Sequence, residues 1–228
     1  MLLAEEYLLL TTDQESGKSI VDSNRRPMAV AGALFAELTL RERIGMTSHE
    51  LPRGERDRLE ILAERTTEDP ILDAVLIELA DKGGKKPADV LSRWDRSRKL
   101  KNWERALFDR LVARGVMREE KTRVLGIFPQ TRHPEADPGP ERELRARVNA
   151  ALLTDAIPEP RTAALIALLH ASKALPKILS PETDRKAATR RAKEIIESEW
   201  ASQEVVKAIN RVISASAAVT VAAASASS

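Results

Sequence analysis

The sequence of 228 residues lacks several features that define common classes of protein. It contains no cysteine, which excludes disulfide bonds, thiolate metal ligands and cysteine nucleophiles. Aromatic residues make up only 3% of the chain, and no apolar run reaches the roughly 20 residues that a membrane-spanning helix requires. Glutamates interrupt the apolar N-terminal stretch MLLAEEYLLL, which argues against a signal peptide. We therefore expect a cytoplasmic protein that touches membranes only at their surface.

Sequence motifs of common enzymes are missing as well. The chain has no G-x-S-x-G nucleophile elbow, no G-x-x-x-x-G-K-[ST] phosphate loop, no H-E-x-x-H and no G-x-G-x-x-G. Among the isolated histidines, His170 lies in the apolar stretch ALIALLHASKAL and is expected in the core, bonded to a carbonyl or hydroxyl, while His49 is expected in a surface loop. We expect no catalysis and no cofactor. An enzyme whose acid and base converge from distant positions stays an alternative.

One short stretch, TRHPEADPG, places His133, Glu135 and Asp137 within five residues of one another. A metal site would require these three side chains to converge, but three prolines restrict the backbone and no second histidine lies nearby in the sequence. The pattern therefore favours a turn whose side chains cap a helix beginning near Glu141.

Hydrophobic periodicity predicts a mainly α-helical single domain with one short β-hairpin. Helices are expected at Ala29–Ile44 after Pro27, Ile71–Ala80, Pro87–Trp94, Trp103–Leu111, Glu141–Leu153, Arg161–Leu175, Asp184–Glu197 and Ser202–Ile213. The hairpin is expected at Val116–Phe128, where Val116 and Met117 precede the charged turn REEKT and the β-favouring segment RVLGIFP. The Ala/Ser-rich tail 215–228 is expected to prolong the last helix and then fray, which leaves residues 1–214 as the domain.

Positive charge is concentrated in one part of the chain, although the net charge is only +2. Residues 85–125 contain 13 Lys and Arg against 6 Asp and Glu, an excess of seven, so the remainder has a net charge of about −5. The densest part is SRWDRSRKLKNWER, residues 92–105. Such a window attracts phosphates of lipid or nucleic acid, whereas the alternative is a solvated face of long side chains.

A helix followed by a hairpin also occurs in winged-helix DNA-binding domains. In that alternative, Asn102–Arg114 would be the recognition helix and Arg118–Arg123 the wing. The low aromatic content and the small net charge argue against it, because dedicated nucleic-acid binders are usually more basic.

Four segments follow one another along the chain in a recognisable order: LLAEEYLLL, AGALFAELTLRERI, LVARGVM followed by RVLGIFPQTRHPEADP, and RTAALIALLHASKAL. In order and spacing they resemble the Golgi phosphoprotein 3 family, and more closely its bacterial branch, over nearly the whole chain. The resemblance implies a helical bundle wrapped by amphipathic helices and no catalysis. It also implies peripheral attachment to the cytoplasmic membrane face through phosphatidylinositol 4-phosphate, binding of cytosolic tails of membrane proteins, and self-association through the hairpin 116–128.

The resemblance further implies where a lipid headgroup would bind. The family's headgroup tryptophan falls on Asp22, its first arginine on Ala31, and its second cationic pair on Lys101 and Glu104, so only Lys101 keeps the charge. Neighbouring cations are expected to supply the phosphate donors, which gives a site of Arg25, Arg26, Arg98, Lys101 and Arg105. Trp103 is interpreted as a core anchor of its helix, with a place at the lipid boundary as the alternative.

Overall fold

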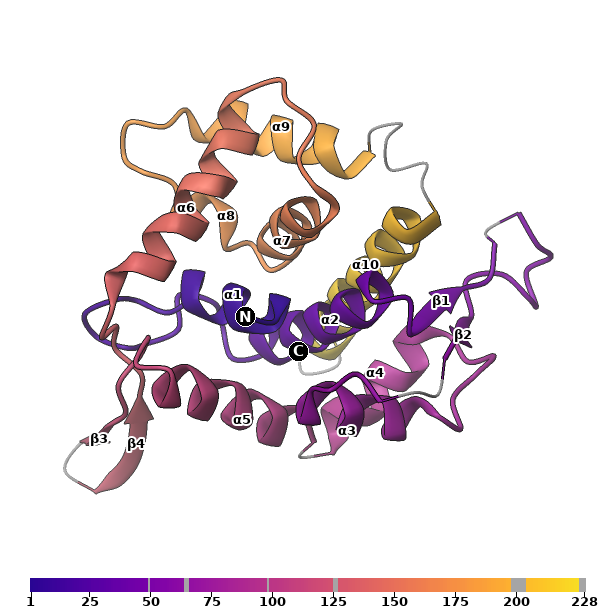
Figure 1. Ribbon diagram of the computed structural model, residues 1–228, viewed down its shortest axis with the longest axis horizontal. Coiled ribbons are helices and arrows are strands. Elements are labelled where there is room, and N and C mark those ends of the chain that lie inside the picture. The colour runs from indigo at the N-terminus through magenta and orange to yellow at the C-terminus, as the bar shows by residue number, and fades with distance from the viewer. Residues whose placement is uncertain (49, 64–65, 98, 125–126, 198–203, 226–228) are drawn as a thin grey trace.

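The computed structural model of the chain describes residues 1–48, 50–63, 66–97, 99–124, 127–197 and 204–225. These residues form ten helices and two small antiparallel hairpins, which confirms the mainly α fold class (Figure 1). The helices are α1 (Leu3–Leu10), α2 (Arg25–Leu40), α3 (Pro70–Leu79), α4 (Pro87–Arg96), α5 (Lys99–Ala113), α6 (Pro138–Leu153), α7 (Pro160–Ala171), α8 (Leu175–Ile178), α9 (Arg185–Glu197) and α10 (Glu204–Ser225). The strands are β1 (Ile44–Met46), β2 (Leu59–Ile61), β3 (Glu120–Val124) and β4 (Phe128–Arg132).

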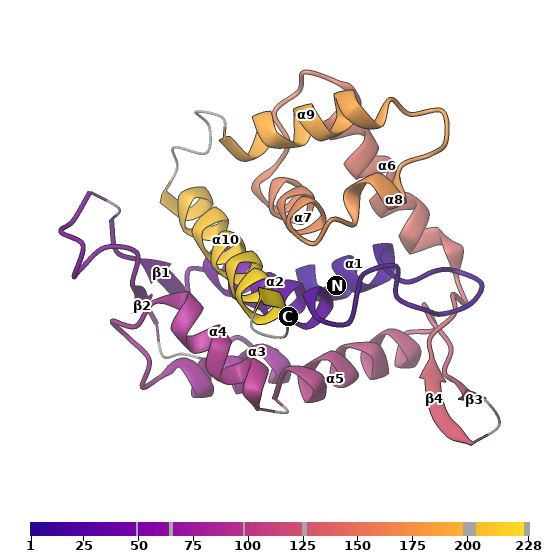
Figure 2. The same ribbon diagram turned by 180° about the vertical axis from the view of Figure 1, so that it is seen from behind.

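The two N-terminal helices form the centre of the molecule. In Figure 1, α1 and α2 lie between a lower layer of α3, α4 and α5 and an upper layer of α6 to α9. Figure 2 shows α10 crossing the opposite side, where it packs against α2. Every residue of α1 is buried, and α2 is buried continuously from Met28 to Thr39. Helices enclosed on all sides need apolar residues on all sides, which explains the unbroken LLL and AVAGALFA runs.

Prolines begin four of the helices. Pro70, Pro87, Pro138 and Pro160 occupy the first turn of α3, α4, α6 and α7, where the missing N–H costs no hydrogen bond. Gly115 ends the α5 segment with a left-handed φ of 70°, so that the Val116 amide reaches the Leu111 carbonyl at 3.0 Å. Glycine suits this left-handed position because it has no Cβ atom to clash with the preceding turn.

The end of α2 differs from the prediction. The helix expected to reach Ile44 stops at Leu40, because Glu42 adopts a left-handed φ of 54° and turns the chain. Ile44 then lies in β1, paired with Ile61 of β2. Apolar spacing alone does not distinguish the last turn of a helix from a three-residue strand, and so this second hairpin was not predicted.

The predicted hairpin exists, but its strands lie further along the chain than Val116–Phe128. Strands β3 and β4 pair Glu120 with Arg132 and Val124 with Phe128, so REEKT is not the turn. Val116 and Met117 are buried at the base, where Met117 forms a single bridge with Glu135. Charged residues make up much of β3 because the ribbon projects from the body into solvent (Figure 1).

An aromatic cluster joins the central and lower layers. The Trp94 ring packs edge-on against Phe35 at 5.2 Å and against Trp103 at 4.8 Å. Trp103 is 9% exposed, which confirms its interpretation as a core anchor. At the other end of the chain, α10 continues across the proposed boundary between residues 214 and 215. Among the described residues, no helix combines the length and the apolarity that crossing a bilayer requires.

Candidate functional site

Helix α5 has one buried face and one face that lines a cavity. Trp103, Leu107 and Leu111 are buried in the core. Helical spacing places Lys101, Glu104, Arg105 and Phe108 on a neighbouring stripe, and all four line a cavity of about 1100 Å³. The basic window of the sequence thus presents alternating charges and an aromatic ring to one space.

The remaining walls of the cavity come from segments distant in sequence. The loop between α1 and α2 contributes Lys18 and Ser19, the first turn of α2 contributes Arg26, and the hairpin contributes Lys121 and Arg132. The loop is fastened to the base of the hairpin, since the His133 amide donates to the Gly17 carbonyl at 3.3 Å and the Glu135 amide donates to the Gln14 carbonyl at 2.9 Å. The cavity therefore depends on the tertiary fold.

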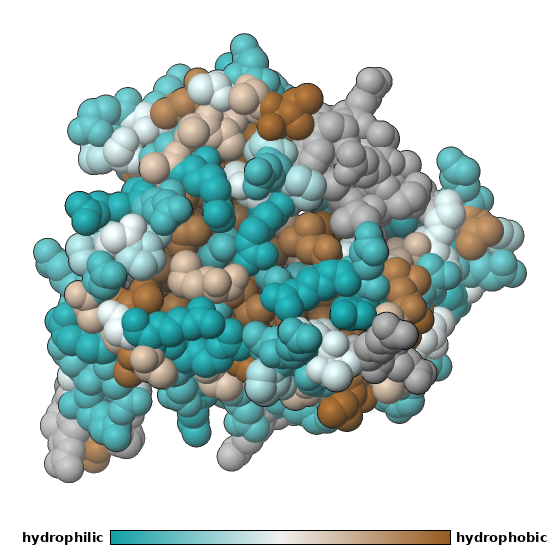
Figure 3. Space-filling view, viewed as in Figure 1, coloured by the Kyte–Doolittle hydropathy of each residue, from teal (hydrophilic) through white to brown (hydrophobic). Residues whose placement is uncertain are grey.

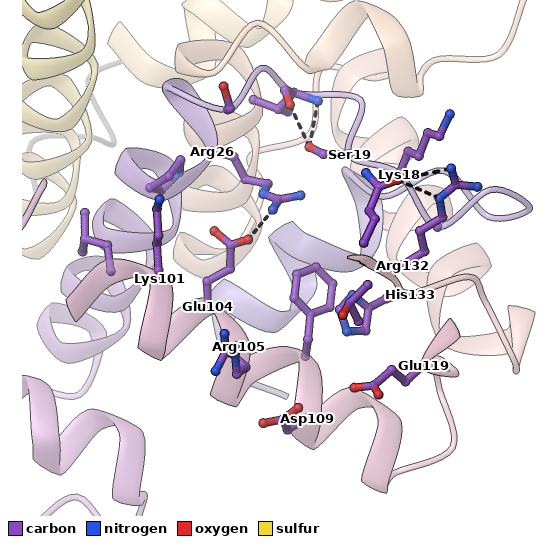
Figure 4. A pocket seen from close by; sticks show the side chains of 18 of the residues that line it. Lys18, Ser19, Arg26, Lys101, Glu104, Arg105, Asp109, Glu119, Arg132 and His133 are labelled. Atoms are coloured by element: carbon purple, nitrogen blue, oxygen red, sulfur yellow. Dashed lines mark hydrogen bonds and ion pairs between the residues drawn. The ribbon is translucent and has the colours of Figure 1, made fainter. Parts of the chain in front are cut away.

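The cavity has an excess of positive charge. Its lining includes six cationic side chains, those of Lys18, Arg26, Lys101, Arg105, Lys121 and Arg132, and three carboxylates, those of Glu104, Asp109 and Glu119. In Figure 4, Arg26, Lys101 and Glu104 lie at the end formed by α2 and α5, while Lys18, Arg132 and His133 lie toward the hairpin. Such an arrangement attracts anions, and the carboxylates can accept hydrogen bonds from hydroxyl groups.

Arg26 is held at the centre of this arrangement. Its guanidinium forms an ion pair with Glu104 and lies 5.9 Å from the centre of the Phe108 ring. The Phe108 ring also contacts His133. The His133 imidazole stacks on it, with the two ring centres 4.1 Å apart and an angle of 8° between the planes. Burial lowers the pKa of His133, although the nearby carboxylates of Glu119 and Asp109 act in the opposite direction. The folded environment therefore favours the neutral form of the His133 ring.

The structure brings together three of the five residues predicted for the site. Arg26, Lys101 and Arg105 line the same cavity. Arg25 does not: it pairs with Asp22 at 2.8 Å and lines a separate cavity of about 80 Å³ near Ser172. Arg98 lies outside the described residues.

The two positions where the resemblance placed other headgroup residues have local structural roles. The Asp22 carboxylate accepts hydrogen bonds from the amides of Asn24 and Arg25, at 3.2 and 2.9 Å, and so fixes the start of α2. Ala31 is fully buried inside α2. Lys18, Lys121 and Arg132 were missed by sequence analysis, because they come from the loop and the hairpin.

The stretch TRHPEADPG joins the hairpin to α6. Thr131 and Arg132 end β4, and the Asp137 carboxylate accepts a hydrogen bond from the Gly139 amide at 2.9 Å as the N-cap of α6. The interpretation as a turn with a helix cap is confirmed, with the helix beginning at Pro138. Within the described part of the chain, no three His, Asp or Glu side chains are grouped so as to hold a metal ion.

His170 is only half-buried, at the end of α7, so its expected place in the core is met in part. Burial lowers its pKa, and Lys193 on α9 acts in the same direction. His49 lies outside the described residues.

A family model for Golgi phosphoprotein 3 (GPP34) matches residues 3–212. The match covers nearly the whole chain, including every segment that lines the cavity, and the chain therefore belongs to the Golgi phosphoprotein 3 family. The family is generally one of non-enzymatic lipid-binding and adaptor proteins. Neither the fold nor this match supports the winged-helix alternative.

Proposed function

We propose that the protein is a non-catalytic peripheral membrane protein whose cavity binds the phosphate of an anionic lipid headgroup. The observation that supports this proposal most is the convergence of Arg26, Lys101 and Arg105 with cations of the loop and hairpin on one open cavity. Charge-assisted hydrogen bonds from arginine and lysine to phosphate oxygens are strong, and each basic residue near an anionic surface contributes ~1 kcal/mol of attraction.

The visible surface favours electrostatic attachment. In Figure 3, hydrophilic side chains cover most of the face seen in that view, and hydrophobic ones show as small separate areas between them and at its edges. Attachment through charge predicts reversible binding that weakens with salt, because ions screen exposed charges over about 8 Å at physiological ionic strength.

The test is co-sedimentation of the protein with vesicles that contain phosphatidylglycerol in phosphatidylcholine. The variant Lys101→Glu/Arg105→Glu should weaken binding about thirtyfold or more, because two basic contacts are lost and repulsion is added. Both side chains are exposed, so the melting temperature should change little.

A matched control reverses two exposed cations of α9, Lys186→Glu/Arg190→Glu, with the same change in net charge. This variant should bind nearly as well as the unmodified protein. Equal losses in the two variants would show that attachment depends on overall charge, and unchanged binding in the α5 variant would refute the proposed site.

We also propose two kinds of protein partner, a second copy of this chain and the cytosolic tails of membrane proteins. Self-association through the hairpin is supported by its projection from the body and by Ile127, which is 74% exposed between β3 and β4. Binding to cytosolic tails of membrane proteins is supported by family membership alone. Light scattering of Ile127→Lys tests the first role, since a dimer held by this residue should dissociate.

A further inference from the structure

An acidic residue lies among the cations of the cavity. The Glu104 side chain is 11% exposed and forms an ion pair with Arg26, whose side chain is 28% exposed. Lys101 and Arg105 flank Glu104 on α5, and all four residues line the cavity. Figure 4 shows the Glu104 carboxylate pointing toward Arg26. A phosphate that reaches Arg26 must therefore either displace this carboxylate or bind beside it.

The charge of the incoming group decides how well it is tolerated there. Like charges placed close together repel strongly where water is partly excluded, and a phosphomonoester has close to two negative charges at pH 7. A phosphodiester has one. A hydroxyl group, in contrast, can donate a hydrogen bond to a carboxylate oxygen.

We propose that Glu104 makes the cavity selective for headgroups that combine a single phosphodiester with free hydroxyls, and makes it disfavour headgroups with an additional phosphomonoester. This inference rests on the proposed function of the same cavity. In the complex, Lys101, Arg105 and Arg26 contact the phosphodiester, and Glu104 accepts a hydrogen bond from a hydroxyl of the polyol. Glu104 is thus a specificity-determining residue.

The experiment compares vesicles that contain phosphatidylinositol with vesicles that contain phosphatidylinositol 4-phosphate, in phosphatidylcholine and at equal total surface charge. The unmodified protein should bind the phosphatidylinositol vesicles at least as tightly as the phosphatidylinositol 4-phosphate vesicles. Glu104→Gln removes the negative charge and should shift the ratio of the two dissociation constants about tenfold toward the 4-phosphate.

Two further variants separate charge at this position from other effects. Glu104→Asp keeps the carboxylate and should keep the original ratio. Glu194→Gln makes the same change in net charge on the exposed surface of α9, where Glu194 pairs with Arg191 at 3.4 Å, and should also keep the ratio. Circular dichroism and melting temperatures establish that each variant is folded.

The outcomes separate this inference from the proposed function. If the unmodified protein binds neither anionic vesicle better than pure phosphatidylcholine, both are wrong. Anionic binding with a clear preference of the unmodified protein for the 4-phosphate overturns the specificity role alone, whether or not any variant folds. An unchanged ratio in Glu104→Gln, or an equal shift in Glu104→Asp or Glu194→Gln, overturns it as well.

Discussion

His133 is the residue in the cavity whose charge changes nearest to neutral pH. Its imidazole stacks on Phe108, and the charged groups that act on it are Glu119 and Asp109, which raise its pKa, and Arg26, which lowers it. Burial is the largest of these influences and lowers the pKa, so folding favours the neutral ring. The stability that results is present above the unfolded pKa near 6.5 and is lost as the pH falls through the folded pKa. A bound phosphate would favour the charged ring instead.

We therefore predict that binding to phosphatidylglycerol vesicles strengthens as the pH falls from 7.5 to 5.5, by roughly fivefold for the one added charge. His133→Phe keeps a ring for the stack on Phe108 and should abolish most of this dependence. His170→Gln on α7 is the control and should retain it. Co-sedimentation at several pH values measures the effect, and an equal pH dependence in all three proteins would contradict it.

At the residue scale, sequence analysis located cations of two helices, α2 and α5, and missed those of the loop and the hairpin. Lys101 and Arg105 share a dense basic window, and Arg26 starts the adjacent apolar helix, so local patterns were sufficient to indicate them. Lys18 is a single charge in a loop, and Arg132 is a single basic residue within TRHPEADPG. Their approach to the cavity depends on tertiary contacts that no local pattern contains.

Element boundaries were predictable where a residue has a strong backbone preference. The proline that begins α4 and the glycine after α5 mark their places because few conformations suit them, whereas the helix expected from Glu141 begins earlier, at Pro138. The hairpins were less predictable. Strand β3, with the sequence EKTRV, is mostly polar, and its pairing with β4 is set by the contacts at its base.

One contact, between the α1–α2 loop and the base of the hairpin, holds a wall of the cavity in place. Gly17 has a left-handed φ of 63°, and a Cβ atom there would lie 2.5 Å from the backbone nitrogen of Pro134. The absence of a side chain lets the loop with Lys18 lie against the base of the hairpin.

We predict that Gly17→Ala lowers the free energy of unfolding by about 2–3 kcal/mol, through backbone strain and a clash with a backbone atom. Gly84→Ala is the matched control, because Gly84 has a φ of 71° but no atom within 4 Å of the added Cβ, and it should cost only about 1 kcal/mol. Urea denaturation measures both values. Similar costs would mean that the contact with Pro134 relaxes easily.

At the scale of the whole molecule, buried ion pairs join the central helices α1 and α2 to the upper layer. Glu6 on α1 pairs with Arg161 at 3.0 Å and with Arg147 at 2.8 Å, and Glu37 on α2 pairs with Arg161 at 3.0 Å. The second Glu37 oxygen accepts from Arg41 at 2.9 Å. Arg161, at the start of α7, therefore links the upper layer to both central helices.

The last prediction concerns this link. Arg161→Met keeps an unbranched side chain but removes the guanidinium. The carboxylates of Glu6 and Glu37, each less than 10% exposed, are then left with one cationic partner apiece. Removing one partner of a buried pair is costly, and we expect a loss of about 2–4 kcal/mol in the free energy of unfolding, because the remaining arginines compensate in part. Arg190→Met, at an α9 side chain that is 74% exposed, should change it by less than about 0.5 kcal/mol. Urea denaturation followed by circular dichroism compares the two, and equal effects would show that the ion pairs of Arg161 do not contribute to holding α1 in the centre.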